Sequence, residues 1–359
     1  MRCGRAPRPP RADAPRRAEL ATKPTDLVQK QALAAVGQAF LMRYYDDFFS
    51  TLGKRCAQVL LTLENLAVRS QYLNARNTFD ALFALGVIPV VNENDTVAVE
   101  ELKWGDNDTL SAQVAALVSA QWLFLLTDVD GLYTANPRRD PDAKRIAVVE
   151  DIGALSADVS QAGTQWGTGG MVTKLTAARL AAAAGCRTVI CKSDAPDAIA
   201  RCLGGEPVGT VFLPVPSAAR GRKRWLLALP PRGELWLDAG AVAALAHRKS
   251  LFPAGVFRAT GAFAAQDAVR LCDAEGRELA RGLVNHCAAD VAALLGRSSR
   301  DTDRTLGYTA VAELVHRDNV CLTALLPETA SGDEGGDEDG DEGDDVDARH
   351  GTAQGNGQA

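Results

Sequence analysis

The sequence predicts an α/β protein: a three-layer αβα sandwich with a mainly parallel sheet, followed by a small β-rich domain. Apolar runs of strand length alternate with helical patterns from residue 26 to about residue 213. Such alternation is typical of parallel strands joined by helices that cover both faces of the sheet. Beyond residues 214–224 the pattern changes to short apolar runs separated by turn signals, which indicates the second domain.

The elements of the first domain follow in order along the chain. Apolar residues at helical spacing begin at Asp26, and Gly86 stands where a helix C-terminus prefers glycine. Strands are expected at 56–61, 87–91, 122–126 and 188–191. Helices are expected at 71–85, 109–120, 171–184 and from about 197.

The predicted domain boundaries follow shifts in composition. The first domain is expected to span 23–215 and the β-rich domain 230–326, joined by a linker at 216–229. The β-rich domain is expected to hold two short helices and strands at 235–237, 255–259, 268–272, 278–284 and 311–315. Residues 1–22 are rich in Arg and Pro and are expected to be disordered or to be a wrongly assigned start. The Gly/Asp/Glu tract 327–359 is expected to be disordered.

Charge and composition exclude several classes of protein. The net charge of −6 comes from the tail, since residues 328–359 hold eleven acidic residues and one arginine, while 21–327 is close to neutral. There is therefore no large basic field of the kind that binds nucleic acid. No apolar run approaches the roughly 18 residues of a membrane span. The eight cysteines are scattered without a CxxC pair, which favours reduced thiols and a cytoplasmic protein, and the four histidines lie far apart.

Two polar segments mark the loop between strand 87–91 and helix 109–120. Asn92 to Asp95 follow the strand directly, and Asp106, Asn107 and Asp108 precede the helix. Open α/β sheets bind ligands outside the carboxyl ends of their strands, so these groups are candidates to hold a small, charged, amino-bearing molecule. The simpler interpretation is that they cap the helix, although one residue is enough for a cap.

A glycine-rich segment, Gly167 to Lys174, leads directly into helix 171–184. Glycines allow backbone N–H groups to approach a phosphate, and a helix N-terminus adds partial positive charge. The order of residues is not that of a Walker A loop. Thr127 and Asp128, at the end of strand 122–126, are further candidates for nucleotide binding. Each segment also has an interpretation that involves no ligand. Gly167 to Lys174 would then be a solvated loop, and Thr127 and Asp128 would form a turn that ends the strand.

Six motifs, taken in order and spacing, resemble the glutamate-phosphorylating members of the amino acid kinase family that carry a C-terminal PUA domain. The resemblance covers about residues 26–325. Its motifs are QALAAVGQ (31–38), LNARNT (73–78), PVVNEND (89–95), GDNDTLS (105–111), LTD with GLYT (126–134) and 167–174.

The resemblance implies transfer of the ATP γ-phosphoryl group to the side-chain carboxylate of L-glutamate, which gives γ-glutamyl phosphate on the way to proline. It implies a glutamate site at Asp95 and Asn107, with Asp106 adding negative charge for the ammonium group. It implies that Lys174 acts on the phosphates and that Asp108 orients lysines around the transferred group. Mg²⁺ is expected on the phosphates, without a metal site made by the protein. The ATP-binding residues implied are Thr127, Asp128, Thr168, Gly169, Gly170, Met171, Val172, Thr173 and Lys174.

The sequence departs from this family in its first part. A strand leading into a Gly-x-Lys-x-Gly-Ser/Thr loop, and a later Ser-Gly-Ala segment, are typical of the family and are not found in these 359 residues. Loss of one cation facing the transition state costs on the order of 10²–10³ in rate. Low kinase activity is therefore expected for this polypeptide.

Two alternatives remain open at this point. One is a related kinase of the same fold that acts on aspartate, acetylglutamate or a nucleotide. The other is a non-catalytic protein that binds RNA through the PUA-like domain, for which the basic residues are modest in number. The basic residues considered for RNA binding are Arg220, Arg222, Lys223, Arg224, Arg248 and Lys249. Feedback inhibition by proline and assembly into a homo-oligomer are also expected from the resemblance.

Overall fold

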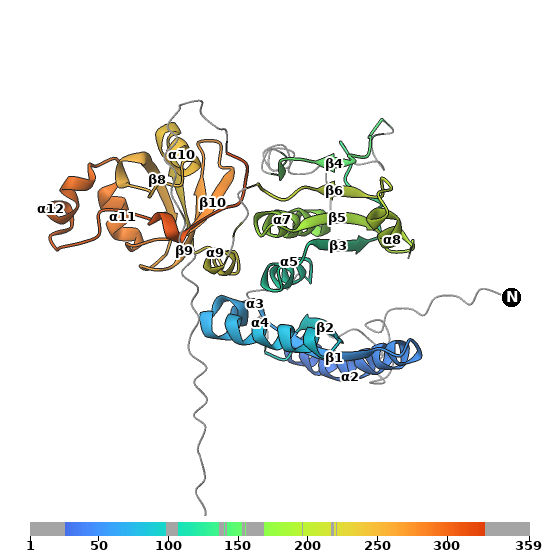
Figure 1. Ribbon diagram of the computed structural model, residues 1–359. Helices are drawn as coiled ribbons and strands as arrows, with labels where there is room; N and C mark the ends of the chain where they lie inside the picture. Colours follow the sequence, from blue (N-terminus) through green and yellow to red (C-terminus); the bar gives the residue numbers. More distant parts are fainter. Residues whose placement is uncertain are drawn as a thin grey trace, which may run out of the picture. The chain divides into compact units, whose positions relative to one another are not determined.

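Parallel strand pairs form the framework of the first domain (Figure 1). The computed structural model describes residues 26–326 except 98–106, 136–139, 141, 153–154, 156–168, 196, 217–218 and 220. These residues all fall in a compact unit that spans 1–327. The predicted disordered segments 1–22 and 327–359 lie outside the described residues.

A long helix and a two-stranded parallel sheet come first. The long helix α2 (Leu27–Thr51) begins at Asp26, whose carboxylate accepts a hydrogen bond from the Gln29 N–H. Strands β1 (Arg55–Leu61) and β2 (Val87–Glu93) pair in parallel. They are joined by α3 (Leu63–Ala67) and α4 (Arg69–Ala84), and Gly86, with φ of 64°, follows α4 as predicted.

A four-stranded sheet with the order β3-β5-β6-β4 comes next. The pairs β3–β5 and β4–β6 are parallel and β5–β6 is antiparallel, so the predicted α/β fold with mainly parallel sheets is confirmed. Strands β4 and β6 were not expected from the sequence. The strands are β3 (Trp122–Thr127), β4 (Val148–Val149), β5 (Arg187–Lys192) and β6 (Thr210–Phe212), and the helices are α5 (Asn107–Leu117), α7 (Gly169–Ala183) and α8 (Ala198–Leu203).

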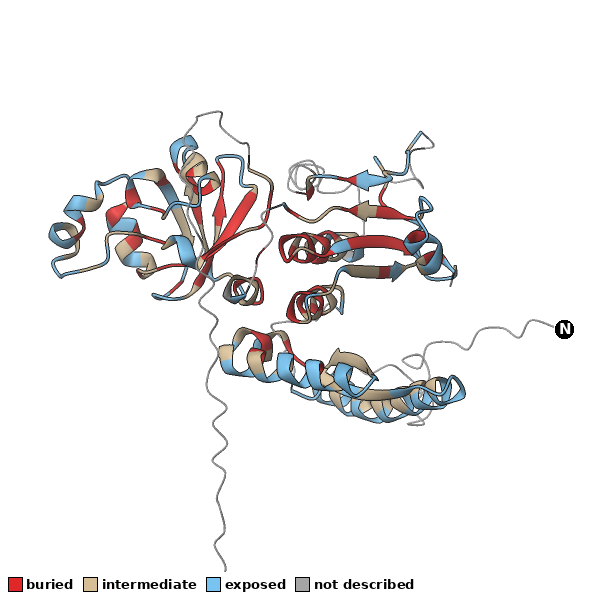
Figure 2. Cartoon of the chain, viewed as in Figure 1, coloured by how far each residue is buried: buried red, intermediate tan, exposed pale blue. Residues whose placement is uncertain are grey.

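Helix α5 contributes to two apolar clusters. Its Leu110 and Leu117 pack in one cluster with Leu61 of β1 and Phe79 of α4. Its alanines share a larger cluster with the alanines of α7, and small side chains on both helices allow their backbones to approach closely. Figure 2 shows buried residues concentrated in α5, α7 and β5, whereas α2 and β2 have no buried residue. The α5–α7 contact therefore fixes the two helix starts relative to one another.

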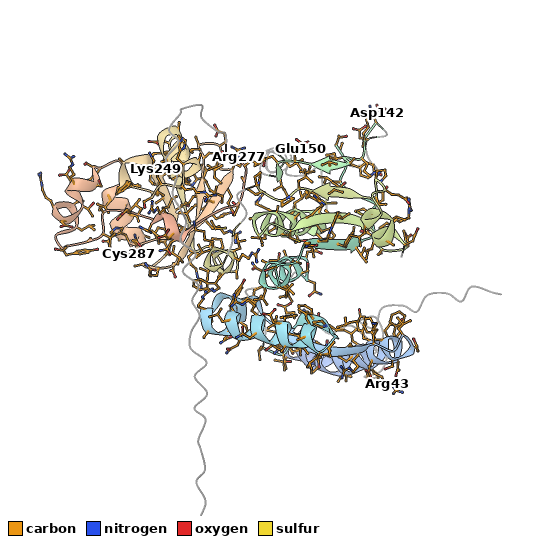
Figure 3. The ribbon with its side chains drawn as sticks, in the orientation of Figure 1. Arg43, Asp142, Glu150, Lys249, Arg277 and Cys287 are labelled. Atoms are coloured by element: carbon orange, nitrogen blue, oxygen red, sulfur yellow. The ribbon has the colours of Figure 1, made fainter. Side chains whose placement is uncertain are left out.

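The second domain is a five-stranded sheet with the order β11-β10-β9-β7-β8. Three α-helices belong to its described part, one more than predicted, and Lys249 (Figure 3) follows the first of them. The strands are β7 (Gly233–Leu237), β8 (Val256–Gly261), β9 (Ala268–Cys272), β10 (Glu278–Leu283) and β11 (Val320–Leu322). The helices are α10 (Ala239–Ala246), α11 (Ala288–Leu294) and α12 (Thr302–Leu306).

Two details differ from the sequence predictions. Residues 311–315 do not form a strand; Val315 makes an isolated bridge to Leu251, and the edge strand is β11 instead. The segment 216–229, predicted as a linker, contains α9 (Arg222–Leu226), and Leu226 and Leu227 are buried. Apolar residues at the end of this basic segment are packed between other elements, which its composition did not reveal.

No described helix is both long enough and apolar enough to cross a membrane.

Candidate active site

The connectivity brings two helix starts and two strand ends to one edge of the sheet. Strands β3 and β5 are parallel and end side by side, with Thr127 opposite Lys192. Helix α5 leads by a short turn into β3, and α7 leads by a short turn into β5. A helix that packs on a strand and precedes it so closely runs in the opposite direction, so both helix N-termini lie at the carboxyl edge, where open α/β sheets bind ligands.

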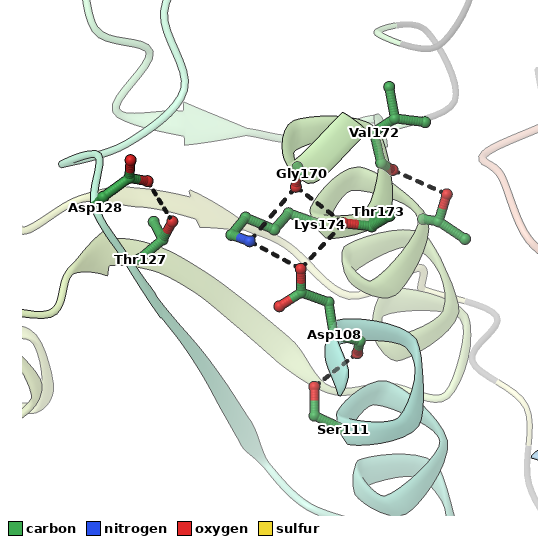
Figure 4. Close-up of polar contacts among 9 residues, drawn as sticks. Asp108, Ser111, Thr127, Asp128, Gly170, Val172, Thr173 and Lys174 are labelled. Carbon is green, nitrogen blue, oxygen red and sulfur yellow. Dashed lines mark hydrogen bonds and ion pairs between the residues drawn. The ribbon is translucent and has the colours of Figure 1, made fainter. Parts of the chain in front are cut away.

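An acid–lysine pair joins the two helix starts. The Lys174 Nζ atom lies 2.8 Å from Oδ2 of Asp108, although the residues are 66 positions apart (Figure 4). The Lys174 side chain is 15% exposed and the Asp108 side chain 21%, so the pair is largely shielded from solvent and can still be reached from it. A charge-assisted contact of this length is among the stronger hydrogen bonds in proteins.

Neighbouring groups hold this pair in place. Thr173 donates its hydroxyl hydrogen bond to Oδ2 of Asp108 at 3.1 Å, and its Oγ1 also lies 2.9 Å from the Gly170 carbonyl. Ser111 donates to the backbone carbonyl of Asp108 at 2.7 Å. The carboxylate stands in the first turn of α5, where the helix dipole favours negative charge. Asp108 is therefore fixed by its own helix and by α7.

Thr127 and Asp128 stand at the exit of β3, as the sequence predicted. The Thr127 hydroxyl donates to Oδ1 of Asp128 at 3.1 Å, and Asp128 is exposed. The segment that follows is held firmly, because the buried Thr210 hydroxyl accepts from the Leu132 N–H at 2.8 Å and donates to the Ile146 carbonyl at 2.6 Å. A rigid strand exit of this kind can present polar groups to a nucleotide.

The predicted glutamate-binding residues are only partly described. Asp95 lies half-buried in the turn after β2, whose path is fixed by a 2.9 Å hydrogen bond from the Asn94 N–H to the Leu61 carbonyl. Asn107 is the exposed first residue of α5. Asp106 lies outside the described residues, and so does Thr168 of the predicted ATP-binding run. The contacts described above join Asp108, Gly170, Thr173 and Lys174, and they do not include Asp95.

The exit of β5 adds polar groups that the sequence analysis did not select. The Ser193 N–H donates to the Thr127 carbonyl at 2.8 Å, and Lys192 pairs with Asp194 at 3.1 Å. The signal was present in the sequence, because these residues follow the apolar run 188–191 just as Thr127 and Asp128 follow theirs. Once β3 and β5 are known to be neighbours, the two exits belong to one surface.

The fold and the site together define a class: an α/β kinase with a small β domain on its C-terminal side. The chain belongs to the amino acid kinase family, whose model matches residues 4–192, and a PUA domain model matches residues 233–306. Curated relatives named glutamate 5-kinase match most of the chain. The protein from Synechococcus elongatus is 55% identical over 307 residues, covering 85% of this chain and 84% of its own. The protein from Nostoc sp. is 54% identical over 309 residues, covering 85% and 82%.

Solved structures with similar parts include carbamate kinase from Giardia lamblia bound to AMP-PNP. It is 16% identical, with a TM-score of 0.39, and covers 57% of this chain and 79% of that chain.

Proposed function

We propose that this chain transfers the γ-phosphoryl group of ATP to the side-chain carboxylate of L-glutamate, as the name of its relatives indicates. A carboxylate oxygen of glutamate forms a bond to the γ-phosphorus, and the bond from that phosphorus to the β,γ-bridging oxygen breaks. The products are γ-glutamyl phosphate and ADP. The observation that carries the proposal is the Asp108–Lys174 pair at the N-termini of α5 and α7.

This arrangement suits phosphoryl transfer, which depends on positioning and on stabilisation of negative charge and needs no nucleophile from the enzyme. We assign Lys174 to the transferred phosphoryl group and Asp108 to orienting Lys174. The N-terminus of α7, with Gly169 and Gly170, offers backbone N–H groups to phosphate oxygens. Thr127, Asp128 and residues 168–173 complete the proposed ATP site, and Asp95, Asp106 and Asn107 the proposed glutamate site.

The residues present fit a Mg²⁺ ion that travels with ATP. The described residues contain no group of three or more His, Cys, Asp or Glu placed to hold a metal, and Asp108 is already engaged by Lys174. Mg²⁺ prefers phosphate oxygens and water to an all-protein cage, so the nucleotide would supply its ligands. When bound, the ion would neutralise phosphate charge.

Hydroxylamine trapping of the acyl phosphate, with ATP and a panel of acceptors, tests the proposal. We expect ADP release and hydroxamate formation with L-glutamate, and much less of both with aspartate or acetylglutamate. With a nucleotide acceptor, which forms no acyl phosphate, ADP release alone is compared, and we expect it to be much lower. A preference for one of those acceptors would instead identify a related kinase. The rate of the unaltered chain also tests the expectation of low activity. Lys174→Met serves as the inactive control.

Other properties expected from the resemblance stay as proposals. They are assembly into a homo-oligomer, which light scattering would test, and inhibition by proline, which proline titration of the kinase reaction would test. The cytoplasmic location inferred from the scattered cysteines also stays a proposal. RNA binding through the β domain is a separate prediction. Arg224, one of the basic residues considered for RNA binding, is engaged internally, because its Nε donates to the Ala219 carbonyl at 3.0 Å. Salt-dependent RNA retention would support that prediction.

A further inference from the structure

A single buried backbone carbonyl connects the kinase helix α5 with the β domain. The Leu227 oxygen, just after α9, accepts a 2.7 Å hydrogen bond from Nε2 of Gln113 on α5. It also accepts a 3.3 Å hydrogen bond from Nη1 of Arg281 on β10. All three residues are buried, so these bonds are protected from competition with water.

The arginine that reaches this carbonyl is itself paired inside the protein. Its Nε lies 2.9 Å from Oε1 of Glu278, and the two side chains are only 10% and 5% exposed. Burying an ion pair is costly unless further hydrogen bonds satisfy it, and for stability alone an apolar pair is often as good. The junction already has apolar packing, because Ala268, Leu283 and Cys321 of the β domain share a cluster with Leu226 and Leu227.

A second kinase helix, α7, carries a charged side chain that is partly buried. The Nε atom of Arg179 is buried without a hydrogen-bond partner among the described residues, and burial lowers the pKa of its guanidinium, an effect that the Glu278 carboxylate partly offsets. Burial raises the pKa of the Glu278 carboxyl, but Arg281 and then Arg179 outweigh that effect and the net pKa is lowered. Glu278 is therefore held in its charged form, and Arg281 is the residue that contacts it.

The anchor on α5 lies close to the site residue of the same helix. Gln113 lies five residues after Asp108. At 1.5 Å per residue this anchor is about 7.5 Å along the helix axis from its site residue. A helix this short moves as a rigid body, so a shift at the anchor moves the helix start.

We propose that the Glu278–Arg281 pair is a positioning element that holds α5, through the Leu227 carbonyl, so that Asp108 meets Lys174 of the adjacent helix α7. The β domain thereby contributes to the kinase site without contacting substrate. This proposal rests on the proposed function for its kinetic consequence, but its structural consequence can be measured independently.

The test uses the full chain with both partners replaced together, Glu278→Leu with Arg281→Met, because removing one alone leaves a buried charge. Gln113→Met removes the anchor from the kinase side. The matched control is Arg277→Met, which breaks a 2.9 Å bond to Asp273 in the turn of the same β9–β10 hairpin (Figure 3). Arg281→Lys keeps the charge but cannot donate to Glu278 and the Leu227 carbonyl in the same way.

Hydrogen–deuterium exchange and steady-state kinetics are the readouts, at a temperature where circular dichroism shows each variant folded. We expect peptides from 107–117 to exchange faster in the double variant and in Gln113→Met. We expect kcat to fall about 10- to 100-fold, the scale of a small misplacement of catalytic groups, with KM changed little. Arg281→Lys should have a melting temperature close to that of the unaltered chain, but a kcat as low as that of the double variant. Arg277→Met should match the unaltered chain in both. Combining Gln113→Met with the double variant should add little, because both break one connection.

Unchanged exchange in α5 of the folded double variant would overturn the proposal, whatever the kinetics show. A normal kcat in that variant, when the unaltered chain phosphorylates glutamate, would overturn it too. If the unaltered chain phosphorylates no glutamate, the proposed function fails while the exchange measurement still decides the positioning role.

Discussion

Replacing Asp108 by asparagine, alone and together with Lys174→Met, tests whether the carboxylate acts by orienting Lys174 or acts on the substrate itself. The carboxylate accepts from Lys174 at 2.8 Å and from Thr173 at 3.1 Å, with both members of the ion pair mostly buried. A hydrogen bond between charged groups contributes about 1.5–3 kcal/mol. If that amount is lost in the transition state, at about 1.4 kcal/mol for each factor of ten, kcat/KM falls about 10- to 150-fold.

Lys174→Met should cost more, on the order of 10²–10³ or above, because it removes the cation that faces the phosphoryl group. If Asp108 acts only by orienting Lys174, the double variant should be no slower than Lys174→Met alone. The assay is hydroxamate formation from L-glutamate and ATP. Glu206→Gln is the control, since it breaks a 2.7 Å ion pair with Arg201 that is about half exposed and should matter little.

Additive effects in the double variant would show that Asp108 acts on substrate directly, and the orienting role would be wrong. An Asp108→Asn enzyme within about threefold of the unaltered chain would refute the magnitude derived from the contact distance and burial. Asparagine also removes a negative charge from the first turn of α5, worth about 0.3–1 kcal/mol, so the melting temperature should be measured alongside.

Three further predictions concern stability and thiol chemistry. Thr210→Val keeps the shape but orphans the buried Leu132 N–H, so urea denaturation should show a loss of about 1–3 kcal/mol; no loss would mean the two hydrogen bonds contribute nothing. Phe79→Ala, at a side chain 1% exposed, should cost about 3–5 kcal/mol in the same assay, and a cost under about 1 kcal/mol would contradict the packing described. Burial raises the pKa of Cys186 to about 11, so at pH 8 a thiol reagent should label it only after unfolding; peptide mapping that finds it labelled in the folded chain would disprove this.

The sequence alone was sufficient for most of the local elements, and three of the candidate site residues that it offered, Asp108, Thr173 and Lys174, are brought into contact by the structure. Strand β5 and helix α7 follow from an apolar run and from a glycine-rich start that leads into alanines, and these signals act over a few neighbouring positions. Lys174 and Asp108 were selected for the same local reason, since each lies near a predicted helix start, beside glycine or polar residues. Residues 311–315 show the limit of such signals: Val311 is 55% exposed, and strand propensity depends on the packing around it.

Only the tertiary structure decided which of these residues meet. Asp108 and Lys174 come into contact because small alanine side chains let α5 and α7 pack closely, and that packing is set by residues far apart in the chain. The buried position of Leu227 was equally hidden, because its basic neighbours 222–224 gave the composition of a linker. Local patterns specify how the backbone turns, whereas the partners of a side chain depend on how the completed elements fill space.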